Sequence, residues 1–188
     1  RLIKGLGSLL IYPSFTASLL SENIDYDITS REPTKFDVLT KYNNFFEFGT
    51  SKEIWKASQK LNTENWQIII IGGKYSGKEI SLESLIKNFH LEERIYKFRC
   101  VEAWSMIVPW YGFQLSELLN FLEPETDTKY ISFKTFFDPK VAFNQKQTWY
   151  PWPYQEIITL EEANTPLAFI ATGLYGKKLP NQNGAPIR

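Results

Sequence analysis

The sequence predicts an α+β fold of mixed sheets and short helices. At 188 residues and 22.0 kDa, the chain has the length of one domain of ordinary size. Segments with strand and helix patterns follow one another without the regular alternation of a doubly wound parallel sheet. Two segments, 94–100 and 130–137, alternate polar and apolar residues as half-buried strands do. A single α+β domain therefore fits better than two large domains.

A hairpin and several short helices are expected along the chain. The isoleucine-rich segment 66–71 ends at two glycines and returns over 78–81, a pattern typical of a hairpin. Ser81 is expected to cap a helix that continues to about Phe89, because the apolar residues after it recur on one helical face. Three further segments are a helix over 116–122, a helical turn over 160–163 and an apolar run over 167–174.

The N-terminal residues are similar to an export signal. Two basic residues precede a short apolar run and then small residues, which is the order found in signal peptides. Arg1-Leu2-Ile3-Lys4 also resembles the second half of the twin-arginine motif Arg-Arg-x-Phe-Leu-Lys. An amphipathic helix of the mature domain fits these residues equally well. We expect residues 1–22 to be the remnant of a twin-arginine-type signal and residues 23–41 to form an extended lead-in.

Charge balance and residue counts exclude several classes of function. Lys and Arg together number 21, as do Asp and Glu, so no global field attracts nucleic acid or an anionic membrane. One Cys excludes an intrachain disulfide and any zinc or iron–sulfur cage of several cysteines. One His excludes a haem held by two histidines. We therefore expect no nucleic-acid partner and no haem bound by this chain.

Two segments that suggest catalysis have simpler explanations. The segment 72–79 matches Gly-x-x-x-x-Gly-Lys, but Glu79 stands where a P-loop needs Ser or Thr to bind magnesium. The following helix also begins too late to receive phosphates, so a glycine-rich hairpin turn is favoured. Glu92 and Glu93 are adjacent, and neighbours on a strand point to opposite faces, which disfavours an acid–base pair.

Cys100, at the end of the strand expected over 94–100, is the strongest candidate for chemistry. Lys97 and Arg99 lie close in sequence and favour the thiolate, which attacks electrophiles or binds metals. A protease-like site would need His90 as its base, most simply across a turn from this strand. A thiolate that holds a redox-active metal needs no His if a cofactor supplies the other ligands. A buried, unreactive thiol is the third interpretation.

Three separated segments resemble one known family. Residues 91–110 are similar to the cysteine segment of the MsrP family, which comprises molybdenum-containing catalytic subunits of periplasmic methionine sulfoxide reductases in the sulfite oxidase superfamily. Residues 42–49 resemble the family's Tyr-Asn-Asn-Phe-Tyr-Glu-Phe-Gly, and residues 182–188 resemble its Gln-Asn-Gly-Ala-Pro-x-Arg loop. The resemblance implies a sulfite-oxidase-like molybdopterin-binding domain over 42–188. The domain is expected to be incomplete, because the family continues with a strand and a Gly-Ile-Lys phosphate-binding segment.

The resemblance also implies which residues form the site. It makes Cys100 the thiolate ligand of molybdenum in a molybdenum-molybdopterin cofactor, and it places Asn44 and Glu102 on the substrate side of the metal. Amide and backbone groups suit the ring nitrogens of the pterin, and a guanidinium can hold a phosphate bidentately. Six residues match positions that contact the molybdopterin: Asn43, Phe46, Glu47, Thr135, Asn183 and Arg188.

The implied activity is reduction of methionine sulfoxide in oxidised periplasmic proteins. Sulfite-oxidising members usually follow the cysteine with Ala-Gly-Asn-Arg-Arg, whereas Glu102-Ala103-Trp104 follows here. A carboxylate near the metal repels sulfite, while Trp104 and Trp110 offer apolar surface to a methionine side chain. Glu102 or water would supply a proton, and a separate membrane haem subunit, MsrQ, would supply electrons. We expect a monomer apart from that membrane partner.

Two other functions stay open from the sequence. A sulfite oxidase-like enzyme, or a reductase of small S- or N-oxides, would use the same cofactor on a different substrate. A metal-free binding module would use an aromatic surface, with the run 149–154 as its exposed patch and Cys100 as a plain buried thiol. A rigid loop packed on its own domain is the favoured interpretation of that aromatic run.

Overall fold

The structure is a computed structural model that describes residues 31–188. The expected export signal over 1–22 lies outside these residues. The helices are α1 (Phe36–Lys41), α2 (Trp55–Ser58), α3 (Leu82–Ile86), α4 (Leu115–Leu122) and α5 (Leu160–Ala163), with the 3-10 turns η1 (Phe46–Phe48), η2 (Phe143–Lys146) and η3 (Asn181–Asn183). The strands are β1 (Gln67–Ile69), β2 (Glu79–Ser81), β3 (Glu92–Arg99), β4 (Ser105–Gln114), β5 (Tyr130–Lys134), β6 (Gln155–Thr159), β7 (Phe169–Leu174) and β8 (Lys177–Lys178).

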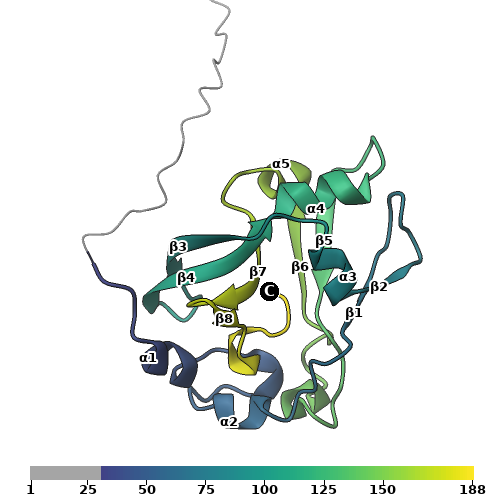
Figure 1. Cartoon of the computed structure of the whole chain (residues 1–188). Coiled ribbons are helices and arrows are strands. Elements are labelled where there is room, and N and C mark those ends of the chain that lie inside the picture. Colours follow the sequence, from purple (N-terminus) through teal and green to yellow (C-terminus); the bar gives the residue numbers. More distant parts are fainter. Residues whose placement is uncertain (1–30) are drawn as a thin grey trace, which may run out of the picture.

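A four-stranded antiparallel sheet, in the order β3-β4-β7-β8, forms the centre of the domain (Figure 1). The register of β4 against β7 shifts between Tyr111 and Gly112. A Cβ at Gly112 would lie 1.9 Å from the carbonyl oxygen of Ile170, so only glycine allows the two backbones to approach this closely. This shift sets which residues of β7 lie beside the end of β4.

Two antiparallel ribbons accompany the sheet. β1 pairs with β2, which confirms the hairpin expected over 66–81, and β5 pairs with β6. The glycine-rich segment is the turn of the first hairpin, where the Gly73 N–H donates to the Glu125 carboxylate at 2.8 Å. α3 begins only at Leu82, with the Ser81 hydroxyl accepting from the Ser84 N–H. The segment therefore has the geometry of a hairpin turn, as the sequence indicated.

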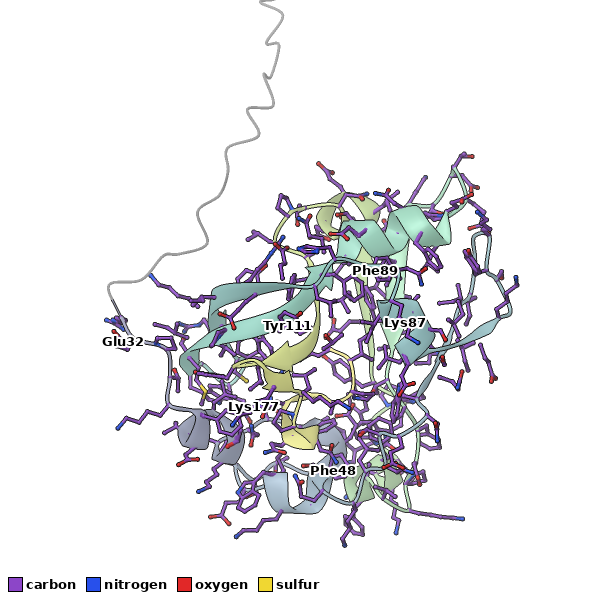
Figure 2. The ribbon with its side chains drawn as sticks, in the orientation of Figure 1. Glu32, Phe48, Lys87, Phe89, Tyr111 and Lys177 are labelled. Carbon is purple, nitrogen blue, oxygen red and sulfur yellow. The ribbon has the colours of Figure 1, made fainter. Side chains whose placement is uncertain are left out.

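Three apolar clusters form the core of the described residues. One lies under the central sheet and includes Leu39, Val108 and Leu174. A second gathers around Phe113 below α4 and α5, and a third gathers around Phe48 near α2. Figures 1 and 2 show α1, α2 and Phe48 at one end of the molecule and α4 and α5 at the other. The central sheet thus lies between two helical ends.

The α+β class with short helices is confirmed, whereas the sheets described in residues 31–188 are antiparallel rather than mixed. Individual elements also differ from the expectation. α1 occupies part of the segment expected to be extended, because Leu39 and Thr40 turn inward while Asp37 and Lys41 suit the charges of the helix ends. α3 ends at Ile86, short of Phe89. The structure also contains β4, β6 and β8, none of which is expected from the sequence. Within residues 31–188, no helix has the length and apolar character needed to cross a membrane.

Phe113→Ala is expected to destabilise the domain by about 3–5 kcal/mol. The side chain is 0% exposed, and its ring stacks on Phe89 at a centroid distance of 4.3 Å. Phe143→Ala is the matched control, because Phe143 is 65% exposed and its loss should change stability by no more than about 0.5 kcal/mol. Urea unfolding followed by circular dichroism measures both variants. Equal losses of stability would contradict the packing described here.

Candidate active site around Cys100

Cys100 lies in a tight turn that joins β3 to β4. The Cys100 N–H donates to the Trp104 carbonyl at 2.9 Å, and the Ala103 N–H donates to the Cys100 carbonyl at 3.0 Å. Ala103 adopts a positive φ of 69°, which lets the chain reverse within these few residues. The turn therefore fixes Cys100 at the end of the central sheet, half-buried and carrying a free thiol.

The segment after α1 faces this turn. The Asn44 amide nitrogen lies 3.5 Å from the Cys100 sulfur, within reach of a weak hydrogen bond. The ring of Tyr42 meets the ring of Trp104 edge-on at a centroid distance of 5.3 Å. The structure thus brings Asn44 and Cys100 together, although 56 positions separate them in the sequence.

A cavity of about 200 Å³ lies between these segments and the C-terminal loop. Five of the site residues expected from the sequence line it: Asn43, Asn44, Cys100, Asn183 and Arg188. Its other walls are mainly apolar and aromatic side chains of α1, β3 and β4: Leu39, Tyr42, Phe98, Trp104, Met106, Val108 and Trp110. A concave apolar site with a few convergent polar groups is the usual form of a cofactor site.

Two buried amide oxygens at the cavity have no partner among the described residues. The side-chain nitrogens of Asn43 and Asn183 both donate to the Leu39 carbonyl, at 2.9 and 3.2 Å. Their Oδ1 atoms are buried and accept no hydrogen bond. An unpaired buried acceptor costs about 1–3 kcal/mol. A ligand with N–H donors, such as a pterin ring, would pair both oxygens, so these residues fit the expected cofactor.

Arg188 carries positive charge into the same cavity. Its backbone pairs with Ala171 of β7, and its guanidinium lies 4.8 Å from the ring centre of Phe98 and 5.2 Å from that of Trp110. Burial of the guanidinium lowers the pKa of Arg188, while the negative charge of Cys100 opposes this shift. The loop thus presents a guanidinium, held between two aromatic rings, to the thiol side of the cavity.

Phe46, Glu47 and Thr135 form a separate group that does not line the cavity. The ring of Phe46 contacts Trp149, Tyr150 and Trp152 at centroid distances of 5.3–5.9 Å. Burial raises the pKa of Glu47, and a side-chain hydrogen bond from Thr135 partly offsets the increase.

The aromatic run 149–154 packs against Phe46, which agrees with its interpretation as a loop packed on its own domain. Trp149 and Pro151 are the exposed residues of this run, and Trp149 is 68% exposed although its ring also contacts Phe46. The structure brings Phe46, Glu47 and Thr135 close to this loop rather than to Cys100.

Glu102 does not line the cavity but lies next to Trp104, which does, and its carboxylate has two partners. Lys52 forms an ion pair with it, and the Trp104 indole N–H donates to it at 3.2 Å. The hydrogen bond from Lys52 is the main cause that lowers the pKa of Glu102. Glu102 is therefore not an isolated negative charge, and the expectation that it repels sulfite needs correction. Sequence reasoning missed Lys52, because no local pattern links residues 50 positions apart.

The structure does not support a Cys–His pair. His90 precedes β3 and Cys100 follows it, so the whole strand separates the two residues. Eight strand residues span about 26 Å, far beyond the reach of a hydrogen bond. The placement of His90 across a turn from Cys100 is therefore wrong. Among residues 31–188, no three His, Cys, Asp or Glu side chains gather as a metal site.

Comparison with known proteins places these features in a family. A family model described as the oxidoreductase molybdopterin binding domain matches residues 55–188. The chain is 48% identical over 158 residues to the protein-methionine-sulfoxide reductase catalytic subunit MsrP of Pseudomonas syringae pv. tomato, covering 82% of this chain and 47% of the relative. It is 44% identical over 161 residues to the MsrP catalytic subunit of Xanthomonas campestris pv. campestris, covering 85% of this chain and 50% of that relative.

The chain spans about half the length of the curated relatives it matches. The family model, in contrast, covers most of the chain, including the cysteine turn, the central sheet and the C-terminal loop. The chain therefore belongs to the family of oxidoreductase molybdopterin-binding domains.

Proposed function

We propose that the chain is the catalytic part of a protein-methionine-sulfoxide reductase that uses a molybdenum-molybdopterin cofactor in a sulfite-oxidase-like fold. One observation carries the proposal: the Cys100 thiol faces a cavity in which two buried amide oxygens lack donors. Its similarity to two MsrP catalytic subunits supports the choice of substrate. Cys100 is the proposed metal ligand.

The residues of the cavity would hold the cofactor from three sides. Asn43 and Asn183 accept hydrogen bonds from ring N–H groups through their unpaired Oδ1 atoms. Arg188 offers planar, charge-assisted donors to anionic groups and balances the negative charge of the thiolate. When bound, the cofactor supplies two-electron oxygen-atom transfer. Phe46, Glu47 and Thr135 remain proposed contacts, from the group beside the 149–154 loop.

The substrate side is proposed to lie at the mouth of the cavity. The side-chain amide of Asn44 donates a weak hydrogen bond to the sulfur of Cys100. The rings of Tyr42 and Trp104 offer apolar surface to a thioether side chain. Reduction of a sulfoxide to a thioether and water consumes two protons together with two electrons. Water at the mouth would supply these protons, and Glu102, whose pKa is lowered by the hydrogen bond from Lys52, would pass them on rather than store one. These side chains bind and orient a neutral sulfoxide next to the thiolate end of the cavity.

Partner and location follow from the same proposal. The relatives are named catalytic subunits, which implies a partner subunit for them. We propose that a membrane haem subunit, MsrQ, delivers electrons to this chain and that oxidised periplasmic proteins are its substrates. Export through the twin-arginine pathway would place the protein in the periplasm.

Replacing Cys100 with Ser is expected to change the metal site. The wild-type protein, produced as the full chain, should contain about one molybdenum per chain by mass spectrometry. Cys100→Ser should lower the molybdenum content or abolish methionine sulfoxide reduction, because an alcohol is a far weaker ligand than a thiolate. Ser132→Ala, on the exposed β5, is the control.

The outcome also separates the alternatives. Absence of molybdenum from both proteins would overturn the enzyme proposal and favour a metal-free binding module. Competition between sulfite and methionine sulfoxide in the loaded wild type then distinguishes the two enzyme activities. Faster turnover of sulfite would overturn the assignment of methionine sulfoxide as substrate.

Arg188→Met is expected to weaken cofactor binding by about tenfold or more, because charge-assisted hydrogen bonds contribute about 1.5–3 kcal/mol each. The measurement is the pterin content of purified protein, by fluorescence after oxidation, as a function of added cofactor. Arg31→Met is the matched control, because Arg31 lies outside the cavity that Arg188 lines. Equal pterin contents in the two variants would contradict the role given to Arg188.

A further inference from the structure

Lys52 lies just outside the cavity and connects the two segments that form its opposite walls, although neither Lys52 nor Glu102 lines the cavity itself. Its backbone carbonyl accepts a hydrogen bond from the Asn43 N–H at 3.2 Å, so it is tied to the segment that carries Asn43 and Asn44. Its ammonium reaches across to Glu102, two residues beyond Cys100 on the opposite wall. Lys52 therefore links the asparagine segment to the cysteine turn.

The ion pair between Lys52 and Glu102 adds little to the stability of the fold. Its main effect is that the two opposite charges cancel each other. The side chains of Lys52 and Glu102 are 29% and 33% exposed, and ion pairs in contact with solvent typically contribute less than about 1 kcal/mol. Their charges nevertheless act on any group that enters the mouth, because the field of a partly buried charge reaches several ångströms. With both residues present, the mouth has no net charge from this pair.

We propose that Lys52 is a specificity-determining residue that cancels the charge of Glu102 and thereby lets the site accept methionine sulfoxides with acidic neighbours. Without Lys52, the carboxylate of Glu102 would stand alone beside the cavity and would repel acidic segments of a substrate. The hydrogen bond from Trp104 would still hold the carboxylate in place, but a neutral indole cannot compensate its charge. The choice of substrate in this inference rests on the proposed function.

Peptide kinetics test this inference in the cofactor-loaded protein. Three peptides carry one methionine sulfoxide flanked by Glu, Gln or Lys and are otherwise identical. Lys52→Met should raise the KM for the Glu-flanked peptide about fivefold relative to the Gln-flanked peptide, lower it for the Lys-flanked peptide, and leave kcat within about twofold. Lys52→Arg should restore the wild-type order. An equal change of KM for all three peptides would overturn the inference.

The control for this experiment is another ion pair of the same segment. Lys56 pairs with Glu53 at 2.9 Å, and both side chains are more exposed than those of Lys52 and Glu102. Lys56→Met removes one positive charge without touching Glu102. It should leave the order of the three peptides unchanged, and a shift as large as that of Lys52→Met would overturn the specific role of Lys52.

Fluorescence quenching tests the charge at the mouth without relying on activity. The contribution of Trp104 is the difference between each protein and its Trp104→Phe counterpart. At constant, low ionic strength, Lys52→Met should reduce quenching of Trp104 by iodide about twofold and leave quenching by neutral acrylamide unchanged. Glu102→Gln should increase quenching by iodide. Unchanged iodide quenching in Lys52→Met would overturn the inference.

The two measurements also separate this inference from the proposed function. A wild-type protein that reduces none of the peptides, but shows the expected iodide pattern, would overturn the proposed substrate and still support the charge role of Lys52. A wild-type protein that reduces the peptides, with no change of preference in Lys52→Met, would overturn the inference alone.

Discussion

The antiparallel register of β3 against β4 is the constraint on which the site depends. Arg99 pairs with Ser105, so the five residues between them must close as the turn that carries Cys100. Side chains alternate across a strand, which puts Phe98 on the cavity face of β3 and Met106, Val108 and Trp110 on that of β4. A shift by one residue would turn all of these side chains away from the cavity. The same register therefore fixes the thiol, the apolar walls and the two rings that hold Arg188.

The cavity brings together segments that are distant in sequence, and it leaves two buried polar groups without hydrogen-bond partners. Asn43 and Asn183 donate to the same carbonyl of α1, which ties the α1 segment to the C-terminal loop, but both leave an amide oxygen buried and unpaired. A ligand that supplies donors would remove the cost of these unpaired oxygens in the folded state only, because the unfolded chain exposes both amides to water. Cofactor binding and stability of this part of the fold are thus linked through the two asparagines.

Local patterns in the sequence predict some parts of the fold well and others not at all. The β1–β2 hairpin, the Ser81 cap and β3 follow from residue types and periodicity over a few neighbours. β4 escapes that reasoning because it is nearly continuously apolar and contains a proline, which is unusual within a sheet. Cys100 could be singled out by its place at a strand end, whereas the asparagines and Arg188 required a family resemblance. Lys52 could not be found either way, because its role depends on a contact across 50 positions.

The charge arrangement at the site changes how selection among sulfur oxides must work. A bare carboxylate next to the metal site would exclude sulfite by repulsion alone, but Glu102 is paired with Lys52. Arg188 adds positive charge farther inside the cavity, so an anion would meet no net repulsion from these three groups. In the proposed reductase, discrimination in favour of a sulfoxide would then come from the apolar rings of Tyr42 and Trp104, which can pack against a thioether chain but offer nothing to a small hydrated anion. The contact between these two rings, rather than the charge of Glu102, would therefore decide this selection.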